Sequence, residues 1–268
     1  MKKVLYYHIY LSDDYGMWSS MFLEQMKQLE DSGLLSELDV IRLVCITQGD
    51  KRMEAFRQLC TTKFDTEKEV KIELSLVKNP YPNDQVMLDN IESDYTITEN
   101  FTYRMIYDAC KTEEMYVCYI HSKGITAADN FLKNRIIDAQ RYKDYYYWRQ
   151  FLSWGVIKNW RKCVDALNKG YDVAGVNYFE KPSRHFSGNF WWARSDYIKN
   201  LPDPATKDWW EELRTKSTDA WLKTTSDRFR DEQWLCSDPK VKVYKVVDID
   251  EEDNPAKKFL PQSKYEKE

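Results

Sequence analysis

The residues best suited to chemistry lie in one segment, 184–202, which reads R-H-F-S-G-N-F-W-W-A-R-S-D-Y-I-K-N-L-P. A half-buried strand would alternate polar and apolar positions. Here aromatic residues crowd around Gly188, and a glycine within a strand indicates a bulge or a close approach to the backbone. Aromatic faces beside an open backbone suit a flat, polar ligand such as a sugar. The alternative is an aromatic core strand with a glycine bulge.

Other chemistries find less support. His8, His121 and His185 fall on separate predicted elements without H-x-x-x-H spacing, so we predict hydrogen-bonding or core roles for them and no metal site. Ser187 is a potential nucleophile, but F-S-G lacks the G-x-S-x-G turn that exposes a catalytic serine. The sequence contains neither a G-x-G-x-x-G nor a Walker phosphate loop.

The elements that must position these residues alternate between strand and helix over the first 120 residues. Predicted strands are 3–11, 38–47, 70–77 and 115–120, and predicted helices are 18–30, 52–61 and 98–110. This alternation is typical of a parallel, doubly wound α/β sheet. Ligands of such sheets bind at the carboxyl ends of the strands.

Polar residues follow three of these strands directly. They are Ser12, Asp13 and Asp14 after the first strand, Gln48, Gly49 and Asp50 after the second, and His121, Ser122, Lys123 and Gly124 after the fourth. The carboxyl ends of parallel strands lie at one edge of the sheet, so these positions are the first candidates for a ligand site.

The second half continues without a linker. It contains a long helical region over 130–167, with two helices meeting near 153–155, and a strand over 171–177 before the aromatic segment. Helical turns over 196–201, 209–214 and 231–235 and a strand over 241–247 follow. With only 8 glycines and 8 prolines and no composition shift, the chain is predicted to be one domain over 1–268.

Composition narrows the class of protein. The net charge of −4 argues against nonspecific nucleic-acid binding. An aromatic share of 15% favours a ligand surface rich in flat faces. Six cysteines without a close C-x-x-C pair predict buried, reduced thiols. The N-terminal apolar run is interpreted as a strand, not a signal peptide, and no stretch reaches membrane-spanning length, so we expect a cytoplasmic protein without a membrane span.

The order of elements over 100–124 resembles that of nucleotide-sugar glycosyltransferases of the GT-A type. In this unit a helix with Asn100 and Arg104 leads to a buried strand that ends in H-S-K-G. The block H-F-S-G-N-F-W-W-A at 185–193 sits where that fold places its sugar and acceptor segment, and D-E-Q-W at 231–234 sits where it often carries a catalytic base. Over roughly 4–202 the chain also resembles a group of bacterial and large-virus proteins with H-I-Y, H-[ST]-K-G and H-F-S-G-N-F-W-W motifs.

The resemblance implies a GT-A-like α/β fold with a mostly parallel central sheet flanked by helices. Residues 1–124 would form a Rossmann-like nucleotide-binding half, and 125–268 the sugar and acceptor half. The implied donor substrate is a nucleotide-sugar, and the implied acceptor is a glycan or glycoprotein. The implied activity is transfer of a hexose or pentose to a glycan hydroxyl, with inversion, in polysaccharide or glycan assembly.

The sequence departs from the GT-A pattern at 121–123, where related enzymes carry Asp-x-Asp on a divalent metal. Mg²⁺ and Mn²⁺ prefer carboxylate oxygens, and Lys123 would repel a cation. We predict that Lys123, together with His121, neutralises the diphosphate leaving group and that no metal cofactor is required. The alternatives are Mn²⁺ or Mg²⁺ on other carboxylates such as Asp13, Asp14 or Asp94, and a plain surface turn at 123–124.

The resemblance also assigns roles to individual residues. Glu232, with Asp231 second, is the candidate base that takes the acceptor proton; the alternative for both acids is helix capping. Predicted donor contacts are His8, Tyr10, Asp13, Arg104, His121, Ser122 and Lys123, with Asp50 weaker. Predicted sugar and acceptor contacts are His185, Ser187, Gly188, Asn189, Trp191 and Trp192. Because strand neighbours alternate in direction, one of the two tryptophans is expected to face the sugar.

Two other function classes stay open. A non-catalytic carbohydrate-binding protein on the same fold would explain both the missing Asp-x-Asp and the aromatic richness. A hydrolase would need a second convergent acid, and the sequence identifies none. Release of nucleotide from a nucleotide-sugar without an acceptor distinguishes an enzyme from a binding protein.

Overall fold

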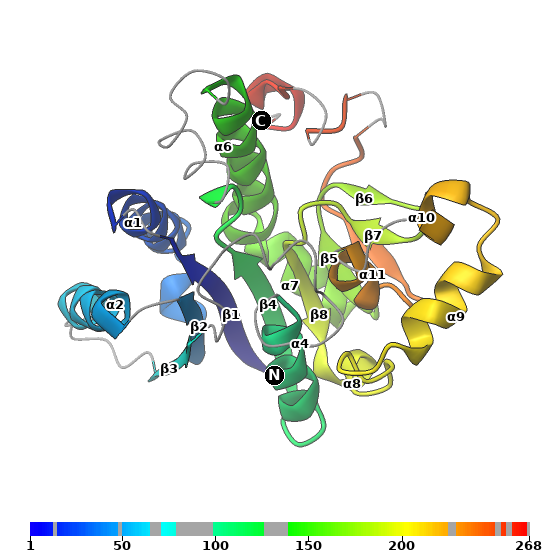
Figure 1. The fold of residues 1–268 in the computed structure, drawn as a ribbon, viewed down its shortest axis with the longest axis horizontal. Coiled ribbons are helices and arrows are strands. Elements are labelled where there is room, and N and C mark those ends of the chain that lie inside the picture. Colours follow the sequence, from blue (N-terminus) through cyan, green and yellow to red (C-terminus); the bar gives the residue numbers. More distant parts are fainter. Residues whose placement is uncertain are drawn as a thin grey trace.

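The architecture is a seven-stranded sheet between two layers of helices (Figure 1). The computed structural model describes residues 1–12, 15–47, 50–64, 71–78, 99–125, 139–224, 229–249, 253–255 and 259–266. Across the sheet the strands are β3 (Lys71–Lys78), β2 (Val40–Thr47), β1 (Lys2–Leu11), β4 (Met115–His121), β8 (Trp191–Arg194), β5 (Val173–Gly175) and β9 (Val243–Lys245).

The sheet is mostly parallel, as predicted. Strands β3, β2, β1 and β4 run parallel, β8 is antiparallel to both of its neighbours, and β5 and β9 are parallel. The chain moves outward from β1 through β2 to β3 and then returns to the other side of β1 as β4. This change of direction between β1 and β4 is the topological switch point at which doubly wound sheets bind ligands.

Helices cover both faces of the sheet. One face carries α1 (Tyr15–Asp31), α2 (Asp50–Phe64), α6 (Ala139–Ser153), the π-helical turn η2 (Trp154–Lys158) and α7 (Trp160–Asn168). The other carries α4 (Glu99–Cys110), α8 (Ser195–Ile198), α9 (Asp208–Lys216), α10 (Ala220–Thr224) and α11 (Arg230–Trp234). Smaller elements are η1 (Leu35–Glu37), β6 (Tyr178–Phe179), β7 (His185–Phe186) and η5 (Gln262–Lys264).

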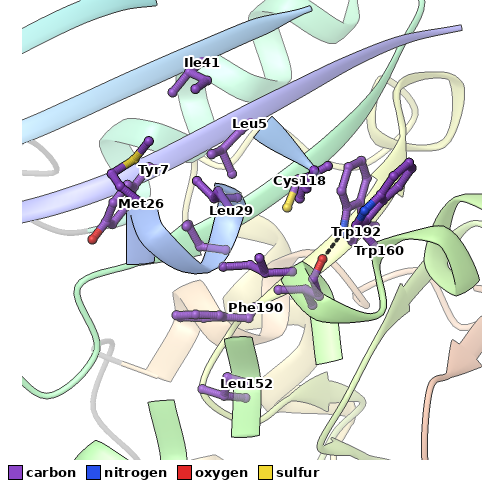
Figure 2. Packing of buried hydrophobic residues seen from close by; sticks show 14 of the residues in the cluster. Leu5, Tyr7, Met26, Leu29, Ile41, Cys118, Leu152, Trp160, Phe190 and Trp192 are labelled. Atoms are coloured by element: carbon purple, nitrogen blue, oxygen red, sulfur yellow. Dashed lines mark hydrogen bonds between the residues drawn. The ribbon is translucent and has the colours of Figure 1, made fainter. Parts of the chain in front are cut away.

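Alternation along the strands fills two separate cores. In β1, Leu5 and Tyr7 point into the core under α1, and Val4 and Tyr6 point into the core under α4. Figure 2 shows part of the first core, in which the Trp192 indole donates a 2.8 Å hydrogen bond to a backbone carbonyl of η2. Burial on both faces explains why β4 is buried at every position.

The long helical region divides at the predicted place. Helix α6 ends at Ser153, η2 follows, and α7 begins at Trp160. Gly155 in η2 lies so close to the sheet that a Cβ there would come within 2.3 Å of Val176. The glycine therefore permits the contact between this junction and the strand region after β5.

The aromatic segment differs from the sequence interpretation. It forms β7 and β8 with a tight turn between them, in which Gly188 and Asn189 take positive φ values of 88° and 63°. Eight of the ten tryptophans are buried. The aromatic richness therefore builds the two cores, which corrects the expectation of a ligand surface rich in flat faces.

The thiols are as predicted: all six cysteines are buried, and none forms a disulfide. No helix within the described residues is both long and apolar enough to cross a membrane.

Candidate functional site at the carboxyl edge of the sheet

Polar side chains from several parts of the chain meet at the switch point. The carboxyl ends of β1 and β4 lie side by side there, with His8 opposite His121 in the strand register. The backbone N–H of Tyr10 donates a 3.0 Å bond to Ser122 Oγ, and the backbone N–H of Ser122 donates to the His8 carbonyl at 3.0 Å. These bonds place His8, Tyr10 and Ser122 at one edge of the sheet, as the sequence predicted.

Lys123 meets Glu232 at this edge. Its Nζ lies 3.8 Å from Glu232 Oε1 and 4.2 Å from the centre of the Trp148 ring. The side chains of Lys123 and Glu232 are 14% and 23% exposed, so both reach solvent from a largely enclosed position. An ammonium held against an aromatic face and a carboxylate is kept in a narrow range of positions. Trp148 is a site residue that the sequence interpretation missed.

His121 is held through its Nε2 nitrogen. Nε2 lies 2.9 Å from the Gly188 carbonyl oxygen, and because a carbonyl only accepts, Nε2 carries the proton. Nδ1 lies 3.3 Å from Glu99 Oε1. Burial, together with the charge of Lys123, lowers the pKa of His121 to about 3. A neutral ring adds no positive charge for a diphosphate, which corrects the expectation that His121 shares that role with Lys123.

Glu99 is the second residue that the sequence interpretation missed. Its Oε2 accepts hydrogen bonds from Tyr119 Oη at 2.9 Å, Tyr103 Oη at 3.1 Å and Asn189 Nδ2 at 2.6 Å. The only sequence signal is an acid in the first turn of a helix, for which the helix dipole is a sufficient explanation.

The turn between β7 and β8 packs against α6. A Cβ at Gly188 would come within 2.5 Å of Leu152 Cδ1 and 3.0 Å of the Trp148 ring, and its φ of 88° also favours glycine. Ser187 donates its backbone N–H to the Asn177 carbonyl at 2.9 Å. Asn189 Oδ1 accepts from Trp191 Nε1 at 3.0 Å. The turn is therefore fixed from both sides beside Lys123.

The two acids of α11 have different environments. Asp231 is buried; its Oδ1 accepts from Asn100 Nδ2 at 3.3 Å and lies 3.6 Å from Arg230 Nε. The bond from Asn100 ties α11 to the first turn of α4. Glu232 is the acid of the pair that faces Lys123.

The remaining candidates have different surroundings. Arg104 is exposed on α4, and Asp50 is exposed at the start of α2. His185 Nδ1 lies 2.8 Å from the Ser183 carbonyl on β7. Asp13, like the alternative metal ligands Asp14 and Asp94, lies outside the described residues.

Trp191 and Trp192 point to opposite faces of the sheet, as strand alternation requires, but both are fully buried. The sheet is covered on both faces at β8, so neither indole lies against a ligand at the surface. This corrects the expectation that one of them faces a sugar.

The end of β4 does not fit a divalent cation. It offers an imidazole whose Nε2 is bonded to the Gly188 carbonyl, a serine hydroxyl bonded to the Tyr10 amide and an ammonium, where such a cation prefers carboxylates. Within the described part of the chain, no group of three or more His, Cys, Asp or Glu side chains could hold a metal ion.

Comparison with known proteins gives a family without an assigned activity. Nothing among the curated proteins matches the chain. Among solved structures it is similar to a 4-diphosphocytidyl-2C-methyl-D-erythritol synthase from Anaerococcus prevotii DSM 20548, at 11% identity, with 95% of each chain covered and a TM-score of 0.35. That likeness is distant, so the fold class rests on the strand order itself. Residues 6–264 match the model of a domain of unknown function, DUF8361, and the chain belongs to that family.

Proposed function

We propose that this protein is a glycosyltransferase that moves a sugar from a nucleotide-sugar donor to a glycan hydroxyl with inversion. The observation that carries the proposal is the meeting of Lys123 and Glu232 at the topological switch point of the sheet. A cation for a leaving group and a carboxylate for a base are the two groups that this transfer needs. They come from β4 and α11, which are far apart in sequence.

The bond changes assign one role to each group. The acceptor oxygen forms a bond to the anomeric carbon while the bond from that carbon to the diphosphate oxygen breaks. The hydroxyl proton goes to the Glu232 carboxylate, and the bonding electrons leave with the diphosphate, whose charge Lys123 neutralises. A lysine serves here as a point charge.

The ion pair that forms without a ligand also indicates the order in which the two groups act. Lys123 Nζ lies 3.8 Å from Glu232 Oε1, so the ammonium and the carboxylate are paired before the donor binds. A diphosphate brings more negative charge than one carboxylate and competes for the ammonium. Donor binding then releases Glu232 to accept a proton.

The test is Glu232→Gln, assayed for sugar transfer and for nucleotide binding by thermal shift. We expect transfer to fall by about 10²–10⁴-fold, the usual effect of losing a general base. Affinity for the nucleoside diphosphate should stay the same or rise, because Lys123 loses its competing carboxylate. Glu212→Gln, at an exposed acid on α9, is the matched control and should keep wild-type transfer. Wild-type transfer by Glu232→Gln contradicts the assignment.

Two further arms test the rest of the proposal. Transfer should survive EDTA, whereas loss with EDTA and recovery with Mn²⁺ contradicts the role of Lys123.

The resting ion pair, which occupies both groups, favours a non-catalytic carbohydrate-binding protein as the second candidate. That candidate predicts a thermal shift with glycans and no nucleotide release from any nucleotide-sugar.

A further inference from the structure

Glu99 connects three elements of the site through one carboxyl group. Its partners are Tyr103 on α4 itself, Tyr119 and His121 on β4, and Asn189 in the turn between β7 and β8. The hydroxyls of Tyr103 and Tyr119 come from side chains that are almost fully buried, and the Glu99 side chain is 23% exposed.

Two of these contacts fix the turn. Asn189 Nδ2 donates directly to Glu99 Oε2 at 2.6 Å, and the Gly188 carbonyl accepts from His121, whose other nitrogen faces Glu99 Oε1. Asn189 has a φ of 63°, a left-handed conformation that is unfavourable for most non-glycine residues. The side-chain contacts of Asn189 stabilise this conformation. Without the Glu99 carboxyl, Asn189 Nδ2 loses a charged hydrogen-bond acceptor.

We propose that Glu99 is a positioning residue for the turn Ser187–Asn189. Through the hydrogen bond to Asn189 Nδ2 it fixes the backbone of this turn beside Lys123, and so fixes where the donor sugar lies; this last step rests on the proposed function. Its effect on the reaction passes through Asn189.

The experiment compares Glu99→Ala with Glu99→Gln. Alanine removes every contact, whereas glutamine keeps the length, accepts with its carbonyl oxygen and donates its amide to His121 Nδ1. For Glu99→Ala we expect amide hydrogen exchange at Gly188 and Asn189 to accelerate at least tenfold and the donor KM to rise at least tenfold, with a smaller change in kcat. Glu99→Gln should restore both values to within about threefold of wild type.

Glu113→Ala is the matched control. Glu113 also accepts from two other segments, through Lys2 and Arg42, and lies at the opposite end of β4. Its loss should lower stability without changing exchange at Gly188 and Asn189 relative to the rest of the sheet. Acceleration in this control equal to that in Glu99→Ala would show a general loosening of the fold and overturn the proposal.

Other outcomes also decide. Wild-type exchange and KM in Glu99→Ala, or a glutamine variant as impaired as the alanine variant, overturns the proposal. If Glu99→Ala fails to fold, Asn189→Gly replaces it, because glycine adopts the same φ and the substitution removes only the amide contacts. Faster amide exchange at Gly188 in this variant supports the proposal. Unchanged exchange overturns it. Exchange is measured without substrate, so it judges Glu99 even if no nucleotide-sugar is turned over.

Discussion

At the residue scale, burial decides which side chains of the site carry charge. His8 and His121 are buried near the carboxyl ends of β1 and β4, and desolvation lowers their pKa values to about 4 and about 3. Both rings are therefore neutral at neutral pH. Among the described residues at the end of β4, the positive charge comes from Lys123, and an anionic ligand must approach that side chain.

The buried His8 ring predicts a pH dependence of stability. Its pKa is about 4 in the folded state and about 6.5 in the unfolded state, so the unfolded chain binds more protons between these values. The free energy of unfolding should therefore fall as pH falls from 6.5 towards 4, by up to about 1.4 kcal/mol per pH unit for this residue.

His8→Asn isolates this contribution, because asparagine keeps a polar group near Thr102 Oγ1, which lies 2.8 Å from His8 Nδ1, and does not titrate. Urea unfolding of both proteins from pH 4.5 to 7.5 measures the difference in slope. Above pH 7 the difference in stability should be constant. Parallel curves over the whole range would refute the neutral, buried state of His8.

At the element scale, the junction between α6 and α7 requires a residue without a side chain at Gly155. A Cβ at Gly155 would lie 2.3–2.9 Å from three carbon atoms of Val176. We expect Gly155→Ala to lower the free energy of unfolding by about 1–3 kcal/mol, the usual effect of overpacking a core. Chemical denaturation measures this value.

Two companion variants separate steric crowding from backbone strain. Val176→Ala on the Gly155→Ala background should recover part of the loss, because it removes the methyl groups in collision. Gly170 has a φ of 92°, and no atom lies within 4 Å of a Cβ placed there. Gly170→Ala should therefore show backbone strain alone, which lowers the free energy of unfolding by about 1–2 kcal/mol. If the second substitution recovers nothing, the explanation by crowding is wrong.

The strands and helices were largely predictable, because the local periodicity of apolar residues indicates them. The division of 130–167 near Ser153 and the strand over 115–120 followed from the sequence. Glu99 and Trp148 did not, since their roles come from partners distant in sequence, such as Asn189 at a separation of 90 residues. The burial of Trp191 and Trp192 also escaped prediction, because alternation shows that two side chains diverge but not that helices cover both faces.

At the scale of the whole molecule, two cores share one sheet and enclose every thiol. Cys45, Cys60, Cys118 and Cys163 lie in the core under α1, and Cys110 and Cys236 lie in the core under α4. Burial raises the pKa of Cys60 and Cys110 to about 12 and also raises the pKa of the other four thiols. Neither a reactive thiolate nor access for a reagent is present while the protein is folded.

Thiol labelling therefore reports on global unfolding. We expect no modification of the native protein by a disulfide reagent at pH 8 on a timescale of minutes, and six modified thiols in denaturant. Lys51→Cys places a thiol at an exposed position of α2 and should react at once, which shows that the reagent is active. Rapid labelling of a native cysteine would show that one of the cores opens locally.

The late position of β8 has a consequence for synthesis on the ribosome. Strand β4 ends at His121, and β8, its partner on the open side, begins about 70 residues later at Trp191. Until β8 emerges, a nascent chain holding β1 to β4 exposes an unpaired strand whose side chains are all apolar or buried in the finished protein. Insertion of β8 then closes that edge and places one tryptophan in each core. We expect a chaperone to bind the nascent chain during this interval of translation, because the unpaired edge of β4 is then exposed.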